Sequence, residues 1–201
     1  MFIPTLWRRS SWGVSLRPGE VRIIGGQWRR TPIRVIDMQG LRPTPDRVRE
    51  TLFNWLGQDL TGYSCADLFA GTGALGFEAA SRGATKVWIF EQSPPLIELL
   101  EKLKSKLKAE AVQIKKGEGV SLLKGLPPNS MDVIFIDPPF DTKNLYELAL
   151  GAASDQLAPG GVIYLESAKK FDNEHLLSYG LSVFKHLKAG AVHAHLLKRL
   201  D

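Results

Sequence analysis

From residue 64 onward, short apolar runs alternate with helical segments, and this alternation constrains the fold more than any other feature of the chain. The runs are rich in β-branched and aromatic residues, which predicts buried strands. Each run is followed by a helix or a short helical turn, and strands connected in this way form a parallel sheet with helices on both faces. The expected strands cover residues 64–68, 86–90, 111–115, 131–136 and 161–165.

Two more apolar runs near the C-terminus, at about 181–187 and 191–198, are separated by the turn Lys188-Ala189-Gly190. A turn of this length between two strands predicts an antiparallel hairpin. The hairpin would close one side of the sheet, so the sequence predicts an α/β fold that is mostly parallel with an antiparallel C-terminal pair.

A glycine-rich turn follows the first predicted strand, and residues 74–81 predict a helix directly after it. Gly71-x-Gly73-x-x-Gly76 has the spacing of a dinucleotide fingerprint, in which glycines allow a ligand to approach the backbone. The helix start offers free N–H groups. Glu91, at the end of the next strand, stands where a ribose-binding acid belongs. A nicotinamide site is therefore one interpretation.

Asp67 favours a different ligand, because it lies four residues before Gly71, where a carboxylate would repel a pyrophosphate but attract a cation. An acid, three residues and Gly-x-Gly, followed by an acid after the second strand, suits S-adenosylmethionine (SAM). Asp67 would face the amino acid part of SAM, and Glu91 the ribose hydroxyls. Other predicted SAM contacts in these segments are Phe69, Ala70, Gly71, Thr72, Gly73 and Gln92.

Asp137-Pro138-Pro139-Phe140 follows the strand predicted at 131–136 and forms a rigid shelf, because prolines fix φ and cannot donate hydrogen bonds. The shelf presents a carboxylate and bare carbonyl oxygens beside a flat ring. Two such acceptors on the N–H bonds of an exocyclic amino group free its lone pair, and the ring can stack on the base. This arrangement has no role in hydride transfer, which argues against the nicotinamide interpretation. A turn whose prolines only end the strand is the simpler alternative.

The glycine turn, Glu91 and the shelf together resemble the class I SAM-dependent amino methyltransferases. Residues 21–29, 41–56 and 188–192 add a closer resemblance, over about 21–198, to the RsmD-type guanine-N2 methyltransferases of small-subunit ribosomal RNA. The resemblance implies a Rossmann-like seven-stranded sheet and SAM as cofactor. It also implies that the target is the N2 amino group of a guanine in 16S ribosomal RNA, within the assembled or assembling small subunit.

The resemblance assigns roles to residues and also shows two departures. It makes Asp137, Pro138, Pro139 and Phe140 catalytic, and it also makes Asp137 a cofactor-binding residue that faces the sulfonium carbon of SAM. It implies that Thr44 and Arg47 help to cover the SAM pocket. Residues 1–20 have no counterpart in the family. Lys116-Gly117-Glu118-Gly119 stands where an Asp or Asn often meets the adenine, so Glu118 and Gly119 are predicted to take that role.

Positive charge is concentrated in residues 1–50, which hold ten arginines, no lysine and four acids, a net charge of +6. The whole chain carries +5, so residues 51–201 carry −1. Guanidinium groups bind phosphates bidentately and stack on bases, and Trp7, Trp12 and Trp28 lie among them, which fits looped RNA. A generic basic surface is the alternative. The predicted RNA-binding residues are Arg22, Gln27, Arg29, Arg30 and Arg42.

Three parts of the chain are expected: a basic extension at 1–20, a hairpin and helix at 21–58, and a methyltransferase domain at 59–201. Runs at 21–24 and 33–36 predict the N-terminal hairpin. Thr44 suits the N-cap of the following helix, whose apolar residues Val48 and Leu52 lie at helical spacing.

Several function classes are excluded or disfavoured. Cys65 is the one cysteine, which rules out an internal disulfide and suits a reducing cytoplasm, and no apolar run has membrane-spanning length. The late histidines have no cysteine partner, so no metal site is predicted and they are expected on the surface or the hairpin. They are His175, His186, His193 and His195.

A cytoplasmic monomer is therefore expected. Three rival functions stay open: an adenine-N6 methyltransferase acting on DNA or RNA, a nicotinamide oxidoreductase, and a non-catalytic RNA-binding module.

Overall fold

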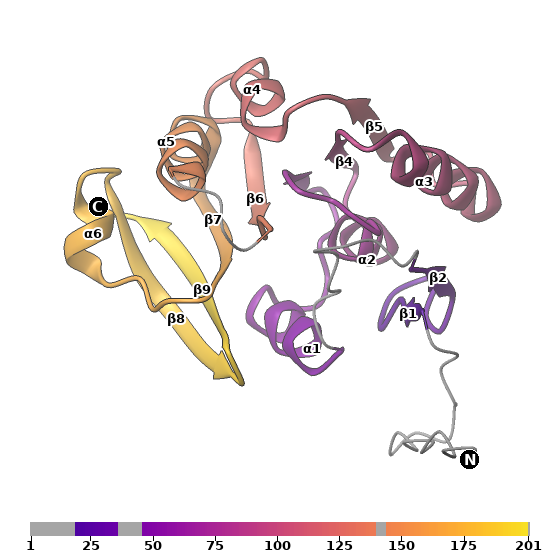
Figure 1. Ribbon diagram of the computed structural model, residues 1–201, viewed down its shortest axis with the longest axis horizontal. Coiled ribbons are helices and arrows are strands. Elements are labelled where there is room, and N and C mark those ends of the chain that lie inside the picture. The colour runs from indigo at the N-terminus through magenta and orange to yellow at the C-terminus, as the bar shows by residue number, and fades with distance from the viewer. Residues whose placement is uncertain (1–18, 36–45, 140–143, 201) are drawn as a thin grey trace, which may run out of the picture.

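The computed structural model describes residues 19–35, 46–139 and 144–200, and a seven-stranded sheet forms its centre (Figure 1). The strand order is β5-β4-β3-β6-β7-β9-β8. The five strands from β5 to β7 are parallel, and β9 runs antiparallel to both β7 and β8. The fold class predicted from the alternation is thereby confirmed. The strands are β3 (Ser64–Asp67), β4 (Lys86–Glu91), β5 (Val112–Lys116), β6 (Met131–Ile136), β7 (Leu157–Ser167), β8 (Leu181–Ala189) and β9 (Val192–Arg199).

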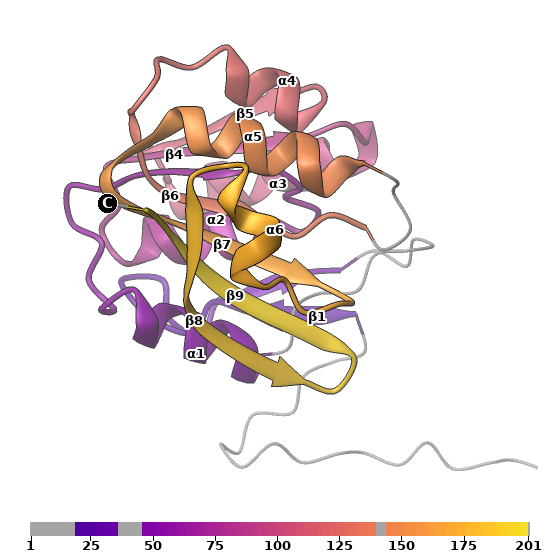
Figure 2. The ribbon, with the colours of Figure 1, turned by 90° about the vertical axis from the view of Figure 1, so that its left-hand side faces the viewer.

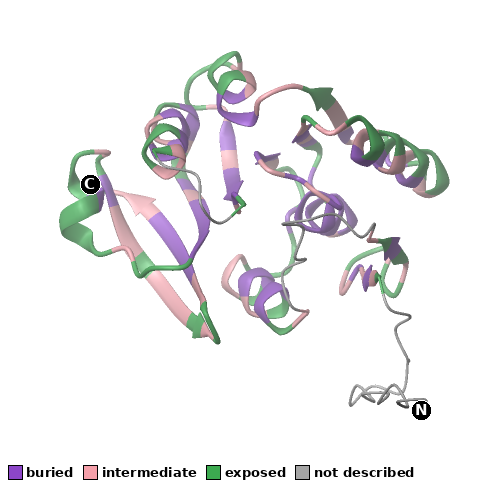
Figure 3. Cartoon of the chain, viewed as in Figure 1, coloured by how far each residue is buried: buried purple, intermediate pink, exposed green. Residues whose placement is uncertain are grey.

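Helices cover both faces of this sheet (Figures 1 and 2). Side chains of β6 alternate between the two layers, with Val133 and Phe135 in one core and Ile134 and Ile136 in the other. Figure 3 shows the buried strands between the layers and the exposed outer sides of the helices. One face carries α1 (Asp46–Trp55), α2 (Ala74–Ser81) and α3 (Pro94–Leu107), and the other α4 (Gly119–Lys124), α5 (Leu145–Gln156) and α6 (Asn173–Leu177).

Four acids lie at the carboxyl ends of four neighbouring parallel strands. Asp67 ends β3, Glu91 ends β4, Glu118 comes two residues after β5, and Asp137 directly follows β6. Because parallel strands end at the same edge, these four acids share one edge of the sheet. The strand order reverses between β3 and β6, and ligands of open α/β sheets bind outside such a reversal.

The N-terminal hairpin consists of β1 (Glu20–Arg22) and β2 (Pro32–Arg34), which pair antiparallel outside the main sheet. Both strands are shorter than the predicted runs 21–24 and 33–36. The first strand ends early because the N–H groups of Ile24 and Gly25 donate to Glu78 of α2 and not to a strand partner. The predicted N-cap Thr44, like Arg42, lies outside the described residues, and so do residues 1–18 of the predicted basic extension.

Two smaller features of the fold bear on the sequence analysis. Cys65, the one cysteine, is fully buried in β3 and belongs to the core. The strand predicted at 161–165 extends over 157–167, and its early part includes the exposed Pro159 and Gly160. Among the described residues, no helix combines the length and the apolar character that crossing a bilayer requires.

Candidate functional site

The glycine turn between β3 and α2 is closely packed and has no room for larger residues. Gly71 and Gly73 have φ values of +52° and +76°, in the region that L side chains rarely adopt. A Cβ at Gly73 would lie 2.5 Å from Leu100 of α3, and one at Gly76 would lie 2.8 Å from Ile89 of β4. The backbone of this turn is therefore held tightly against the neighbouring strand and helix.

Glu91 ties the glycine turn to the segment that enters α3. Its Oε2 accepts a hydrogen bond from the Gly71 N–H at 2.9 Å, and its Oε1 accepts from the N–H groups of Gln92 and Ser93 at 2.8 Å each. A carboxylate has about four acceptor positions, so one is left for a ligand hydroxyl. Glu91 lies where the sequence predicted it, beside the glycines.

Asp67 lies beneath the glycine turn and is only 2% exposed. Its Oδ2 accepts the Gly76 N–H at 3.0 Å. Burial raises the pKa of Asp67 to about 7 and the nearby Glu91 charge adds to the rise, while hydrogen bonds from the Gly76 and Phe69 backbones oppose it. A buried carboxyl group with such a pKa is poised to ionise when a cation arrives.

Glu118 caps the N-terminus of α4. Its Oε1 accepts from the Val120 N–H at 2.9 Å and its Oε2 from the Ser121 N–H at 2.7 Å. Partial burial alone would raise the pKa of Glu118, but these hydrogen bonds outweigh burial and lower it. A Cβ at Gly119 would lie 2.0 Å from the Leu68 carbonyl oxygen, so α4 starts directly against the end of β3. Glu118 and Gly119 thus lie close to the glycine turn.

The shelf after β6 is described as far as Pro139, and Phe140 lies outside the described residues. Pro138 is buried, Asp137 is half-buried and Pro139 is exposed. Burial raises the pKa of Tyr146 to about 12, and the charges of Asp137 and Glu166 contribute to the rise. The Asp137 carboxylate is therefore close enough to Tyr146 of α5 for its charge to act on the tyrosine hydroxyl.

A polar group behind the shelf was not found from the sequence. Tyr164 and Glu166 of β7 are both buried, and the Tyr164 hydroxyl donates to Glu166 Oε1 at 2.6 Å. The Tyr146 hydroxyl is also buried and has no hydrogen-bond partner among the described residues. The sequence does contain a sign of Glu166. It directly follows the predicted strand 161–165, just as the four strand-end acids lie at the ends of their own strands.

A buried charge cluster attaches the N-terminal hairpin to α2. Glu78 is fully buried and accepts hydrogen bonds from the N–H groups of Ile24 at 2.6 Å and Gly25 at 2.7 Å. It also accepts from Arg82 Nε at 2.8 Å. Arg49 of α1 is fully buried, and its Nη1 lies 3.9 Å from Glu78 Oε2. Glu78 is the one charged residue in the predicted helix 74–81, which is otherwise mostly apolar. Because a buried charge requires a partner, the sequence could have indicated this cluster.

The predicted RNA-binding residues Gln27, Arg29 and Arg30 are exposed on the turn of this hairpin. The Gln27 N–H donates to the Ser81 carbonyl of α2 at 2.8 Å, which fixes the backbone beneath them. Arg22, another predicted RNA-binding residue, is bound within the protein: its Nε donates to Asp46 Oδ2 at 3.1 Å.

Arg47, predicted beside the SAM pocket, is exposed on α1. A cavity of about 170 Å³ opens near Gly71 and Thr72, between β2, the glycine turn and α3. Leucines of α3 form much of its wall, and none of the four strand-end acids is among its lining residues. The cavity therefore adjoins the acidic edge through Gly71 and Thr72, two of the predicted SAM contacts.

Comparison with known proteins identifies relatives across most of the chain. A family model described as "Conserved hypothetical protein 95" matches residues 21–198. Ribosomal RNA small subunit methyltransferase D of Escherichia coli is 44% identical over 153 residues, which are 74% of this chain and 75% of the relative. The protein of the same name from Haemophilus influenzae is 43% identical over 157 residues, 75% of this chain and 80% of the relative.

Solved structures agree with this likeness. The Escherichia coli protein yhhF, solved as a candidate methyltransferase, superimposes with a TM-score of 0.76 and 34% identity, and the match covers 91% of this chain and all of that one. A candidate methylase from Haemophilus influenzae gives a TM-score of 0.71 and 35% identity, with 91% of this chain and all of that one covered.

Proposed function

The chain belongs to the ribosomal RNA small subunit methyltransferase D family, and we propose that it methylates the exocyclic N2 amino group of a guanine in small-subunit ribosomal RNA, with SAM as the methyl donor. The observation that carries the proposal is the position of Asp67 and Asp137. They lie at the ends of the paired strands β3 and β6, on the two sides of the reversal in strand order. A site for a cation therefore adjoins a shelf for an amino group.

The residues at this edge fit SAM by their chemistry. SAM carries positive charge at its sulfonium and its ammonium group, and Asp67 is a buried carboxyl group that such charge would ionise. Glu91 keeps one acceptor position for a ribose hydroxyl, and the packed glycine turn exposes backbone to the ligand. The remaining contacts proposed for SAM are Phe69, Ala70, Gly71, Thr72, Gly73, Gln92, Glu118 and Gly119, with Thr44 and Arg47 covering the pocket.

The shelf would act on the guanine. Bound SAM supplies an electrophilic methyl carbon. The Asp137 carboxylate and the Pro138 carbonyl accept the two N2 hydrogens, which directs the nitrogen lone pair toward that carbon. Phe140 stacks on the base, which is splayed out of the RNA as in other base-modifying enzymes. Positioning of this kind supplies much of the acceleration. The extra N2 proton leaves after methyl transfer, when the amine has become acidic.

The N-terminal hairpin would bind the RNA. Arg29, Arg30 and Gln27 lie exposed on a turn whose backbone is fixed to α2, and α2 begins at the glycine turn. Contacts from this turn to RNA phosphates would therefore be made at a set distance from the methyl donor. Arg22 and Arg42 are proposed as further contacts, and the substrate is proposed to be ribosomal RNA within the small subunit.

Nucleoside analysis tests this function. The protein is incubated with isotope-labelled SAM and small ribosomal subunits from cells that lack this methyltransferase, and the digested RNA is examined by mass spectrometry. We expect label in N2-methylguanosine. Label in N6-methyladenosine would replace the proposal by the adenine alternative. Absence of transfer, together with thermal stabilisation by a nicotinamide nucleotide and not by SAM, would overturn it. Extracted RNA assayed in parallel shows whether the assembled particle is required.

A further inference from the structure

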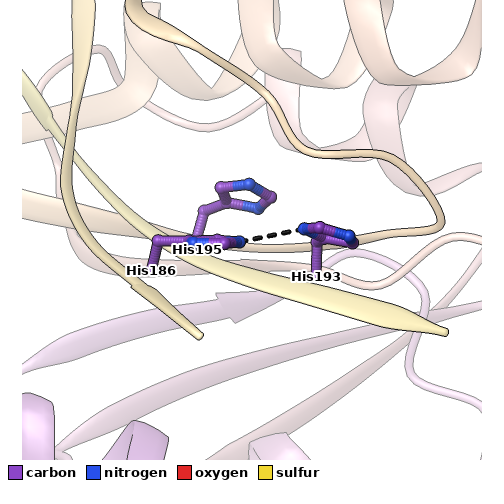
Figure 4. A group of neighbouring side chains, drawn as sticks. All are labelled: His186, His193 and His195. Carbon is purple, nitrogen blue, oxygen red and sulfur yellow. Dashed lines mark hydrogen bonds between the residues drawn. The ribbon is translucent and has the colours of Figure 1, made fainter. Parts of the chain in front are cut away.

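Three histidines of the β8–β9 hairpin, His186, His193 and His195, form a cluster that we call the histidine stack (Figure 4). The ring centroids of His186 and His193 are 5.2 Å apart, and those of His186 and His195 are 4.8 Å apart. His186 Nε2 and His193 Nδ1 share a hydrogen bond of 3.0 Å. The hairpin position predicted for these residues is confirmed. His195, however, is fully buried and not on the surface, because it packs beneath Phe171.

The histidine stack lies at the same edge of the sheet as the shelf. His193 pairs with Ser167 near the end of β7, and Leu165 of β7 pairs with Ile136, the residue before Asp137. Two strand spacings, about 10 Å, therefore separate the strand before Asp137 from β9, which carries His193 and His195. Figure 2 shows the end of β7 and the turn of the β8–β9 hairpin on the same side of the molecule.

A row of rings connects the two places. The charge of Asp137 helps to raise the pKa of Tyr146. The ring centroid of Tyr146 lies 5.6 Å from that of Phe171. Phe171 in turn lies 6.0 Å from His195. A series of ring contacts thus runs from the neighbourhood of the shelf to the histidine stack.

The surroundings of the stack are basic. Residues 167–201 contain six lysines and arginines against three acids. Lys170 is exposed and close enough to lower the pKa values of both His186 and His195, after the larger effect of burial. Lys188 is exposed and pairs with His193 across the hairpin. The charge of residues 51–201 as a whole, which is −1, conceals this second positive region.

A metal ion is the obvious occupant of three clustered histidines, whose ligand atoms lie within 4.8 Å of one another. The hydrogen bonds argue against it. His195 Nε2 accepts the Phe171 N–H at 3.1 Å, and its Nδ1 lies 3.4 Å from the Leu165 carbonyl oxygen. His186 and His193 already bind each other, and Lys170 would repel a dication. Nearly parallel rings beside lysines suit a flat, negatively charged partner instead.

We propose that the histidine stack, together with Lys170 and Lys188, is a second RNA-contact surface that holds the strand next to the target guanine. This inference rests on the proposed function, because it adds a contact to the same RNA substrate. A base stacks on the half-exposed imidazoles of His186 and His193, and the two ammonium groups bind phosphates on either side. The shelf then lies between two RNA-binding hairpins, so a splayed guanine is held from both sides.

Charge removal provides the first test. Lys170→Gln combined with Lys188→Gln should raise the KM for unmethylated small subunits on the order of tenfold and lower the salt slope of binding by about 2. The SAM affinity and the turnover at saturating subunits should stay unchanged. The matched control is Lys86→Gln with Lys104→Gln, which removes two charges at the start of β4 and in the last turn of α3. A KM and salt slope equal to those of the control would overturn the proposal.

Ring replacement at His193 provides the second test and separates RNA from a metal. His193→Ala should weaken binding of the subunit on the order of tenfold, whereas His193→Phe keeps a stacking face and should restore it. Zinc binding by the unsubstituted protein, lost in His193→Phe together with RNA affinity, would replace this proposal by a metal site.

Failure of the proposed function would look different from failure of this surface. If the unsubstituted protein transfers no methyl group to guanine, the function is wrong. If it does, and the lysine and histidine variants bind RNA normally, only the second surface is wrong. Thermal unfolding of each variant checks that it is folded.

Discussion

The two hairpins that we assign to RNA binding are held in place by different physical means. The N-terminal hairpin, β1–β2, stands outside the main sheet and is anchored to α2 by Glu78 and Ser81. The C-terminal hairpin, β8–β9, continues the main sheet through backbone pairing along β7 and β9. The first presents arginines and the second lysines and histidines.

The difference teaches where each hairpin is vulnerable. Backbone pairing is shared among many hydrogen bonds, so no single side chain of β8–β9 decides its position. The N-terminal hairpin depends on a few buried polar contacts, and removal of one partner leaves others buried and unpaired. A substitution far from the RNA can therefore displace one hairpin and leave the other intact.

Glu78→Gln should have the largest effect, because it leaves the guanidinium groups of Arg49 and Arg82 without their buried carboxylate. Breaking a buried pair in this way costs about 3–5 kcal/mol of unfolding free energy. Urea denaturation measures the loss. The control, Glu98→Gln, breaks the exposed pair with Lys102 and should cost less than about 1 kcal/mol. Equal losses of unfolding free energy in Glu78→Gln and Glu98→Gln would contradict the claim that buried polar contacts hold the N-terminal hairpin in place.

Acid titration should separate the C-terminal hairpin from the SAM site. Burial lowers the pKa of His195 from 6.5 to about 4, so its contribution to stability is present above 6.5 and is lost as the pH falls toward 4. This loss is about 3 kcal/mol at most. The pKa of Asp67 is raised from 3.8 to about 7, so its contribution is present below 3.8 and is lost as the pH rises toward 7.

The two contributions therefore oppose each other between pH 4 and 6.5. Relative to the unsubstituted protein, His195→Phe should gain stability on acidification, since the Asp67 titration remains, and Asp67→Asn should lose it. Unfolding free energies from pH 7.5 to 4.5 provide the check. Parallel profiles for all three proteins would show that neither group titrates as described.

SAM affinity should depend on pH through Asp67, the buried carboxyl group beneath the glycine turn. A cationic ligand favours the ionised carboxyl group, so the Kd for SAM should rise about tenfold for each pH unit below 7. Glu118, whose pKa is lowered, stays charged in this range. Calorimetry in two buffers of different ionisation enthalpy should detect proton release near pH 6.5. A Kd that is the same at pH 8 and pH 6 would contradict the role of Asp67.

Arg29→Ala combined with Arg30→Ala should have the smallest effect, about tenfold in the Kd for small subunits, with a salt slope lowered by about 2. The SAM affinity should not change, because these side chains are exposed on the hairpin turn and are not among the proposed SAM contacts. Combined with the Lys170 and Lys188 substitutions, the losses should add, since separate sites act independently. An unchanged salt slope of subunit binding would contradict the proposed contact between the N-terminal hairpin and RNA.

The sheet and its acidic edge were predictable because strand periodicity and strand ends are local properties of a sequence. Asp67, Glu91, Glu118 and Asp137 each follow an apolar run, and parallel pairing brings them together. The anchor of the N-terminal hairpin was not predictable in this way.

That anchor joins Gly25 to Glu78, 53 residues apart, and its formation depends on which face of α2 meets the hairpin. The burial of His195 likewise depends on a loop, at Phe171, that folds over the hairpin. Phe140, Thr44 and Arg42 lie outside the described residues, so their roles stay predictions from the sequence.

Asp137→Ala tests the central claim most directly, because it removes a shelf acceptor and leaves the buried Asp67 and the glycine turn intact. SAM binding by calorimetry and methyl transfer to unmethylated small subunits are measured on the same preparation. We expect an unchanged Kd for SAM and a kcat lowered on the order of 100- to 1,000-fold, as for loss of one oriented group at a reacting centre. Turnover close to that of the unsubstituted protein would contradict the assignment of the shelf.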